Sequence, residues 1–174
     1  MSVSIIVTCE EQQPQLRELL PVLLSQQYEG EYEVIVVDKK HDKDMEEWLE
    51  DMESQYPHLS HTFCPASTRG IDVHRLALML GAKAANFDWL VLLPASACLE
   101  GENWLSQLVT RTGELADIVV GITDHKRRWN WFSKYLFLRR FSLFRPTSSI
   151  IFCRRSTLLE RQNVKFSNPQ IIRL

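Results

Sequence analysis

Several residues that could contact a ligand come just after predicted strands. Four of them, after the apolar runs 3–7, 32–37 and 89–93, are Thr8, Asp38, Lys39 and Ser96. The carboxyl ends of parallel strands meet at one edge of a sheet, where such folds bind their ligands. At that edge the carboxylate of Asp38 could bind a ligand or cap the following turn. The ammonium group of Lys39, followed by Lys40, could attract an anion or simply be solvated.

The segment 94–97 limits the chemistry of this edge. The five apolar residues from Trp89 to Leu93 predict a strand that is buried on both faces. Pro94 should end that strand because it has no N–H to donate to a ladder. Residues 94–97 are Pro, Ala, Ser and Ala, so the centre of the expected site offers no charge, no imidazole and no good metal ligand.

The elements that must position these residues alternate between strands and helices. Strands are predicted at 3–7, 32–37, 61–64, 89–93, 118–122 and 148–153. Helices are predicted from Pro14, from Asp42 or Asp44 to about Tyr56, from Asp72 to Ala85, and at 104–115 and 154–161. The third of these helices should have one apolar face, which is formed by Val73, Leu76, Ala77, Leu80 and Ala84. No element is predicted after residue 161.

This order predicts one α/β domain with a doubly wound, mostly parallel sheet and helices on both faces. The length of 174 residues and the hydrophobic fraction of 45% fit one domain with a substantial core. The four cysteines form no CxxC pair, which favours reduced thiols over a metal site. Three of them follow predicted strands, so a thiol cluster near the site stays an alternative.

The charge is divided unevenly along the chain. Residues 1–124, the α/β subdomain, hold 8 Lys/Arg against 21 Asp/Glu, a formal charge of −13. Residues 125–174 hold 12 Lys/Arg against one acid, Glu160, a formal charge of +11. This asymmetry predicts that the C-terminal segment contacts an anionic partner or docks on the acidic part of the chain or of a second copy.

The segment 126–145 is dense in aromatic and basic residues. A helix of this composition could lie on an anionic membrane surface, or it could pack on the sheet, on a partner protein or in a homodimer. No apolar run approaches the ~20 residues needed to span a bilayer, and the N-terminus has no signal-peptide pattern. We therefore expect a cytoplasmic protein with no nucleic-acid partner; in the membrane-surface alternative it is peripheral to the inner face of the membrane.

Several runs together resemble the nucleotide-sugar-binding part of bacterial family 2 glycosyltransferases. The most specific is 76–85, LALMLGAKAA, followed by 88–93, DWLVLL. The opening strand 3–8, the strand 32–38 that ends in an acid, the Trp104-Leu105 pair and 119–121 fall where this family has similar runs. The resemblance covers roughly residues 3 to 156 and implies a GT-A fold.

The resemblance also implies a chemistry, transfer of a sugar from a nucleotide diphosphate to an acceptor hydroxyl. In the family an Asp-x-Asp motif binds Mg²⁺ or Mn²⁺, which neutralises the leaving diphosphate, and a later carboxylate acts as base. Here the motif falls on Pro94-Ala95-Ser96, so neither carboxylate is present. A serine hydroxyl cannot replace a charged oxygen ligand of a hard dication. We therefore expect no metal site and no metal cofactor, and no motif assigns a catalytic base.

Six residues remain candidates for nucleotide binding, of which Arg69 and Arg75 lie near the loop and helix that approach the donor in the family. They are Thr8, Asp38, Lys39, Arg69, Arg75 and Ser96. The favoured interpretation is a degenerate glycosyltransferase-like domain that serves as a binding or scaffolding partner in glycan or lipid-linked sugar assembly, with a UDP-type nucleotide sugar as ligand. One alternative is an active metal-independent glycosyltransferase, in which basic side chains stabilise the diphosphate. The other is a dimerising interaction module with no nucleotide ligand.

Overall fold

The computed structural model describes residues 1–10, 13–65, 72–99, 101–112, 118–122, 149–160 and 170–173. The strands are β1 (Val3–Cys9), β2 (Tyr32–Asp38), β3 (Leu59–Phe63), β4 (Trp89–Pro94), β5 (Ile118–Ile122), β6 (Ser149–Arg154) and β7 (Gln170–Arg173). The helices are α1 (Gln13–Leu24), α2 (Lys43–Gln55), α3 (Val73–Ala84), α4 (Trp104–Thr112) and α6 (Arg155–Glu160). Among these, no helix is long and apolar enough to cross a membrane.

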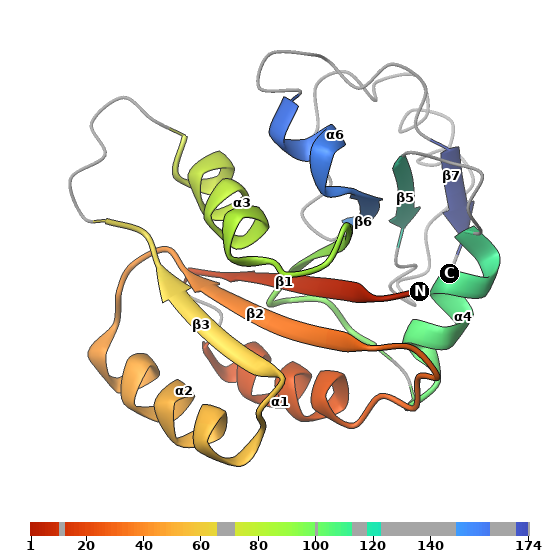
Figure 1. The fold of residues 1–174 in the computed structure, drawn as a ribbon. Coiled ribbons are helices and arrows are strands. Elements are labelled where there is room, and N and C mark those ends of the chain that lie inside the picture. The colour runs from red at the N-terminus through yellow and green to blue at the C-terminus, as the bar shows by residue number, and fades with distance from the viewer. Residues whose placement is uncertain are drawn as a thin grey trace, which may run out of the picture.

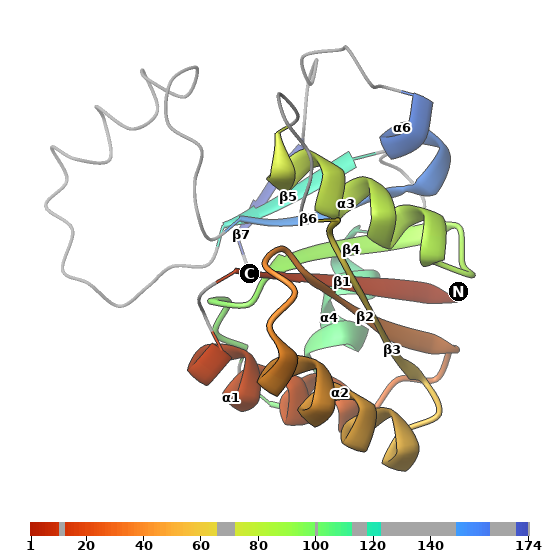
Figure 2. The same ribbon diagram turned by 90° about the vertical axis from the view of Figure 1, so that its left-hand side faces the viewer.

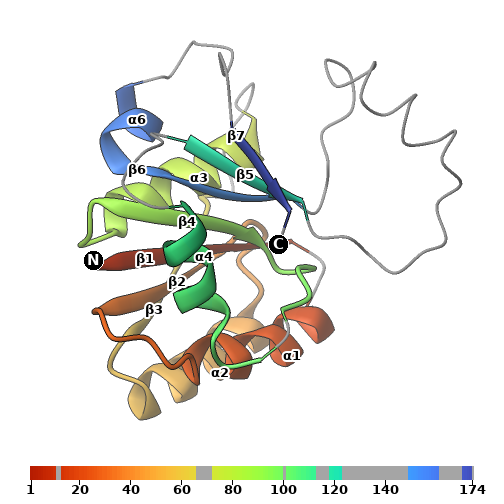
Figure 3. The same ribbon diagram turned by 90° about the vertical axis from the view of Figure 1, so that its right-hand side faces the viewer.

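The described strands form one seven-stranded sheet in the order β3-β2-β1-β4-β6-β5-β7, shown in Figure 3. Strands β1 to β4 are parallel to one another, while β6 runs antiparallel to both β4 and β5. The prediction of a mostly parallel sheet is confirmed. The sequence did not predict the direction of β6, because an apolar run fits a sheet equally well in either direction and only its connections and neighbours decide which one it takes.

Helices cover both faces of the sheet, as predicted. Figures 1 and 2 show α1 and α2 below the sheet and α3 and α6 above it. The buried residues of α4 join the same core cluster as those of α1, so α4 also belongs to the lower layer. Side chains that alternate along each strand therefore enter two separate cores.

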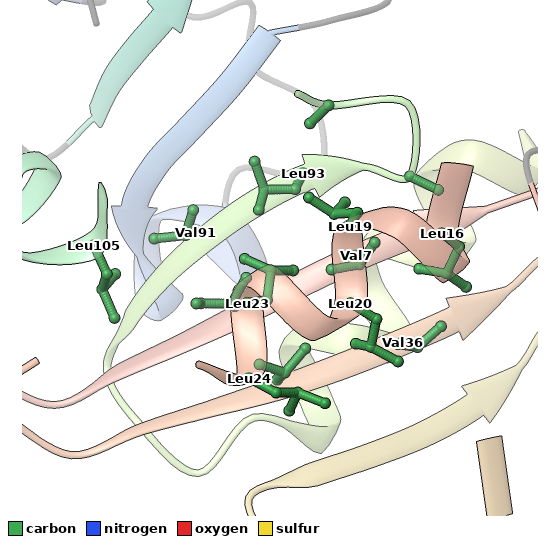
Figure 4. Close-up of a cluster of buried hydrophobic side chains, with 14 of the residues drawn as sticks. Val7, Leu16, Leu19, Leu20, Leu23, Leu24, Val36, Val91, Leu93 and Leu105 are labelled. Carbon is green, nitrogen blue, oxygen red and sulfur yellow. The ribbon is translucent and has the colours of Figure 1, made fainter. Parts of the chain in front are cut away.

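The lower core is built from large aliphatic side chains. Its centre is formed by five buried leucines of α1, shown in Figure 4 with their neighbours on the strands: Leu16, Leu19, Leu20, Leu23 and Leu24. They follow the i, i+3, i+4 spacing that predicts an amphipathic helix. Burying each one stabilises the fold by about 2 kcal/mol relative to leaving it exposed.

The upper core depends on small residues. A Cβ atom at Gly81 would lie 2.4 Å from Cγ2 of Ile6, so α3 can approach β1 only because residue 81 is a glycine. Ala77 and Ala82 are buried beside it. The predicted apolar face of α3 is wrong at its two ends, because Val73 and Ala84 are exposed where the first and last turns extend past the buried turn around Gly81.

The two helices with a predicted N-cap have one, while other element ends differ from the prediction. Asp42 caps α2 and Asp72 caps α3, each accepting hydrogen bonds from two backbone N–H groups of the first turn. β7 was not expected, because four residues next to a proline carry too little periodicity to predict a strand. The predicted helix ends at 113–115 and 161, and the segment 126–145, lie outside the described residues.

Candidate functional site

The ends of the four parallel strands bring distant residues together at what we call the carboxyl edge, the edge at which β1, β2, β3 and β4 end. Cys9 of β1 pairs with Asp38 of β2, and Asp38 pairs in turn with Phe63 of β3. On the other side of β1, Thr8 pairs with Pro94 of β4, and the carbonyl oxygen of Thr8 accepts a hydrogen bond from Ala95 N at 2.9 Å. The candidate residues Thr8, Asp38 and Ser96, at or just after the ends of β1, β2 and β4, thus share one edge.

Asp38 is buried and its carboxylate holds the loop that leads to α2. Oδ1 accepts a hydrogen bond from Lys40 N at 2.9 Å, and Oδ2 accepts one from Asp42 N at 2.8 Å. Of the two roles considered for Asp38, capping the following turn is the one this structure contains. Each carboxylate oxygen still has lone-pair capacity for a further donor.

Lys39 follows Asp38 and lies between the ends of β1 and β2. Its backbone N donates to the carbonyl oxygen of Cys9 at 2.9 Å. Its ammonium Nζ lies 3.4 Å from Oε2 of Glu10, and the side chain of Lys39 is only 13% exposed. Lys39 thus has a mostly covered side chain whose ammonium group forms an ion pair, while Lys40 is exposed.

The cysteines form no cluster at this edge. Cys9 and Cys64 are both buried but belong to different cores on opposite faces of the sheet. Burial raises the pKa of the Cys64 thiol, an effect that the charge of Lys39 opposes and that of Asp38 reinforces. Burial alone raises the pKa of Cys153 to about 12. Cys9 and Cys64 therefore do not meet at this edge, and among the described residues no three His, Cys, Asp or Glu side chains gather, which counts against a functional thiol cluster.

The segment after β4 does not fit a divalent cation. Ala97 N donates to the carbonyl oxygen of Pro94 at 3.0 Å, so residues 94–97 form a tight turn. Ala95 is fully buried and Ser96 half-buried. In the described part of the chain, no three His, Cys, Asp or Glu side chains gather as a metal site would require. The residues present at this turn therefore could not hold a metal ion for catalysis.

An aromatic pair lies beside the edge. His41 adopts φ of +53° and stacks its ring on Phe63, with ring centroids 3.7 Å apart and planes 4° from parallel. His41 Nε2 lies 3.2 Å from Oε2 of Glu46 in the first turn of α2. Phe63 is 40% exposed. The stack covers part of the edge strand β3 next to Asp38.

The arginine candidates are placed differently. Arg75 is exposed in the first turn of α3, where its backbone N donates to Asp72. Arg69 lies outside the described residues. Sequence reasoning missed Glu10, although its position two residues after Thr8, with Lys39 following the neighbouring strand, is a signal that could have identified the pair.

A family model described as glycosyltransferase like family 2 matches residues 2–152. The chain belongs to glycosyltransferase family 2. In this family 2 domain the turn 94–97 follows directly on the carboxyl end of β4. A search of curated proteins finds no significant match.

Solved structures agree on the fold of this family 2 domain. A mannosyltransferase, PcManGT from Pyrobaculum calidifontis, in complex with GDP-Man and Mn²⁺, matches with a TM-score of 0.64 and 21% identity over 92% of this chain and 46% of that one. TarS from S. aureus matches with a TM-score of 0.63 and 18% identity over 93% of this chain and 30% of that one. TarS 1–349 in complex with UDP-GlcNAc matches with a TM-score of 0.61 and 18% identity, over 92% and 47%. The chain thus has the GT-A fold and spans less than half the length of these structures.

Proposed function

We propose that this family 2 domain is a degenerate glycosyltransferase that binds a nucleotide diphosphate or nucleotide sugar without a metal ion and serves as a binding or scaffolding partner in glycan or lipid-linked sugar assembly. The observation that carries the proposal is the turn 94–97, which places uncharged groups where the resemblance expects two metal-binding carboxylates. Without that cation the leaving diphosphate lacks its main source of positive charge.

The choice of ligand is supported by the relatives. The mannosyltransferase structure contains GDP-Man and Mn²⁺, and structures of TarS contain UDP-GlcNAc or UDP. The carboxyl edge of this chain keeps an acid, Asp38, and a cation, Lys39, at the end of β2. These two charges support recognition of a nucleotide, which offers both hydrogen-bond donors and anionic groups.

Isothermal titration calorimetry with UDP, GDP and UDP-sugars tests the proposal, with and without Mn²⁺. We expect a dissociation constant that Mn²⁺ does not change, and no release of sugar from the UDP-sugar. Binding that requires Mn²⁺ would contradict the proposal. Metal-independent binding with slow hydrolysis would favour the active enzyme, and no nucleotide binding would favour the interaction module.

A restored motif sharpens this test. The double variant Pro94→Asp with Ser96→Asp returns two carboxylates to the turn, so Mn²⁺ should then tighten UDP binding. Cys98→Asp places one carboxylate at an exposed position beyond the turn and is the matched control. The double variant should become sensitive to Mn²⁺ while the control stays insensitive.

We further propose that the segment 126–145 brings the protein to an anionic membrane surface, supported by its interleaved aromatic and basic residues. Flotation with liposomes containing anionic lipid tests this, with neutral liposomes as the control. Failure to float, together with a dimer that buries 129–144, would contradict membrane contact and favour a partner interface.

A further inference from the structure

We propose that the ammonium group of Lys39 is the phosphate-binding group of the carboxyl edge, and that Glu10 occupies it as an internal competitor until a ligand arrives. The inference rests on the proposed function for its ligand, a nucleoside diphosphate. It adds which side chain binds the phosphates and which side chain opposes their binding.

Lys39 is held where its ammonium group can meet an anion. Its backbone N–H is fixed to the carbonyl oxygen of Cys9, so the residue is anchored where β1 and β2 end side by side. Its side chain is only 13% exposed, so the surrounding chain limits where the ammonium group can lie. A long side chain can cover its carbon stem in this way while its charged end stays within reach of solvent and of a ligand.

Glu10 supplies the present anionic partner of Lys39, a carboxylate that another anion can displace. Its Oε2 lies 3.4 Å from Nζ of Lys39, but the Glu10 side chain is 50% exposed. A half-exposed carboxylate keeps much of its hydration whether or not it is paired. Ion pairs of exposed groups contribute only about 0.2–1 kcal/mol, so a better anion can displace Glu10 at small cost.

The other acid at this position cannot be exchanged in the same way. The carboxylate of Asp38 accepts hydrogen bonds from the backbone N–H groups of Lys40 and Asp42. Its charge and that of Lys39 both act on the Cys64 thiol, which places the two charges in one neighbourhood. Displacing Asp38 would leave two backbone donors without a partner, whereas displacing Glu10 frees Lys39.

A diphosphate is the anion that this arrangement fits. The turn 94–97 offers it no cation, so positive charge must come from a side chain. A diphosphate carries more negative charge than one carboxylate and offers several acceptor oxygens to the three donors of an ammonium group. It should therefore outcompete Glu10 for Lys39.

Calorimetric titration of inorganic pyrophosphate and of UDP into five variants tests the inference. Glu10→Gln removes the competing charge, and Glu18→Gln on the exposed face of α1 is its matched control. Lys39→Gln removes the binding charge, Lys40→Gln is its neighbour control, and Lys39→Arg keeps the charge. Thermal melts followed by circular dichroism report whether each variant folds.

We expect Glu10→Gln to tighten pyrophosphate and UDP binding about two- to fivefold, the value of the lost exposed ion pair. Glu18→Gln should leave both constants unchanged. Lys39→Gln should weaken both at least tenfold and Lys40→Gln much less. Lys39→Arg should keep most of the affinity, and it tests the binding charge even if Lys39→Gln does not fold.

Two results would overturn the inference. Glu10→Gln could bind no better than Glu18→Gln, or Lys39→Gln could bind as well as Lys40→Gln. If wild type binds UDP under either result, the proposed function stands and only the assignment of Lys39 and Glu10 fails. If no variant binds UDP, Glu10→Gln included, the proposed function fails and the assignment fails with it.

Discussion

The two edges of the sheet use their polar residues differently. At the amino edge, where β1, β2 and β4 begin, hydrogen bonds join segments that are distant in the sequence. Ser4 Oγ donates to Oε1 of Glu33 at 2.6 Å, and Asn86 donates to both carboxylate oxygens at 2.7 Å. Glu33 thereby connects Ser4, which lies 29 positions before it, with Asn86, which lies 53 positions after it.

Gln26 makes a similar connection near the same edge. It is buried, and its Nε2 donates to the carbonyl oxygens of Val22 and Gly101 at 2.8 and 3.0 Å. Its Oε1 accepts a hydrogen bond from Leu105 N at 2.9 Å, in the first turn of α4. The end of α1 and the beginning of α4 are therefore fixed to each other by one side chain.

At the carboxyl edge the side-chain hydrogen bonds of Asp38 are local instead. They join residues two and four positions apart. The long-range side-chain contacts of this loop are the ion pair of Lys39 with Glu10 and the stack of His41 on Phe63, and each of these includes a partly exposed residue. The comparison teaches that side-chain hydrogen bonds between distant segments fasten the amino edge, whereas the hydrogen bonds of Asp38 at the carboxyl edge hold only its own loop. Substitutions at the carboxyl edge should therefore change binding more than stability, and those at the amino edge the reverse.

The largest expected effect is alkaline destabilisation through Cys153, which pairs with Leu90 near the amino edge. Its folded pKa of about 12 lies above the unfolded value of about 8.5–9, so its contribution is complete below pH 8.5 and is lost as pH rises to 12. Stability should fall by about 1.4 kcal/mol per pH unit, or about 4 kcal/mol in total. Urea unfolding at pH 9, 10 and 11 should show a steeper fall for wild type and Cys98→Ala than for Cys153→Ala; parallel curves would contradict this.

Gln26→Ala should cost about 3 kcal/mol, because it leaves Leu105 N and two carbonyl oxygens without their partner in a buried position. The adjacent variant Gln27→Ala removes an exposed contact with Glu102 and should cost less than about 1 kcal/mol. Urea titrations of both variants measure the difference. Equal costs would mean that the amino edge is not fastened through Gln26.

Glu33→Ala should cost about 2 kcal/mol, because Ser4 and Asn86 lose a charged acceptor. Glu31→Ala, at an exposed residue whose contact with Ser2 is 3.3 Å long, is the control and should cost less than about 0.5 kcal/mol. Chemical denaturation again provides the measurement. UDP binding by Glu33→Ala should be unchanged, and a loss of binding would break the division between the two edges.

Asp38→Ala should cost about 1 kcal/mol, since the two backbone N–H groups that lose their acceptor belong to the exposed Lys40 and the half-buried Asp42, where water can replace it. The same variant should weaken UDP binding more than it weakens the fold, because Lys39 depends on that loop for its position. Asp44→Ala, in the exposed first turn of α2, should leave binding unchanged. Comparing thermal melts with UDP titrations tests which of the two quantities changes more.

His41→Gly should change stability by less than about 0.5 kcal/mol. Glycine adopts the observed φ of +53° without strain, which offsets the loss of the stack on Phe63. His41→Val, a β-branched residue at the same φ, should instead cost about 1–2 kcal/mol. A melt in which the glycine variant is the less stable of the two would show that the positive φ does not decide the stability of this position.

Much of the fold follows from residue patterns. The leucine spacing of 16–24 determines which side of α1 is buried, and the run 89–93 determines a strand that both layers cover. Asp72 was recognisable as a helix cap, and Asp42 as one of two candidates with Asp44, because a short acceptor side chain before a helix satisfies its first N–H groups. These features depend on neighbours within a few residues, which a sequence displays directly.

The absence of metal-binding carboxylates at 94–96 was likewise set by the sequence, because it concerns which atoms are present. The tertiary structure decided what those atoms touch. The direction of β6, the approach of Gly81 to Ile6 and the pairing of Lys39 with Glu10 all depend on segments distant along the chain. Such contacts form only when the sheet fixes its strand order and register, and a sequence pattern of short period contains neither.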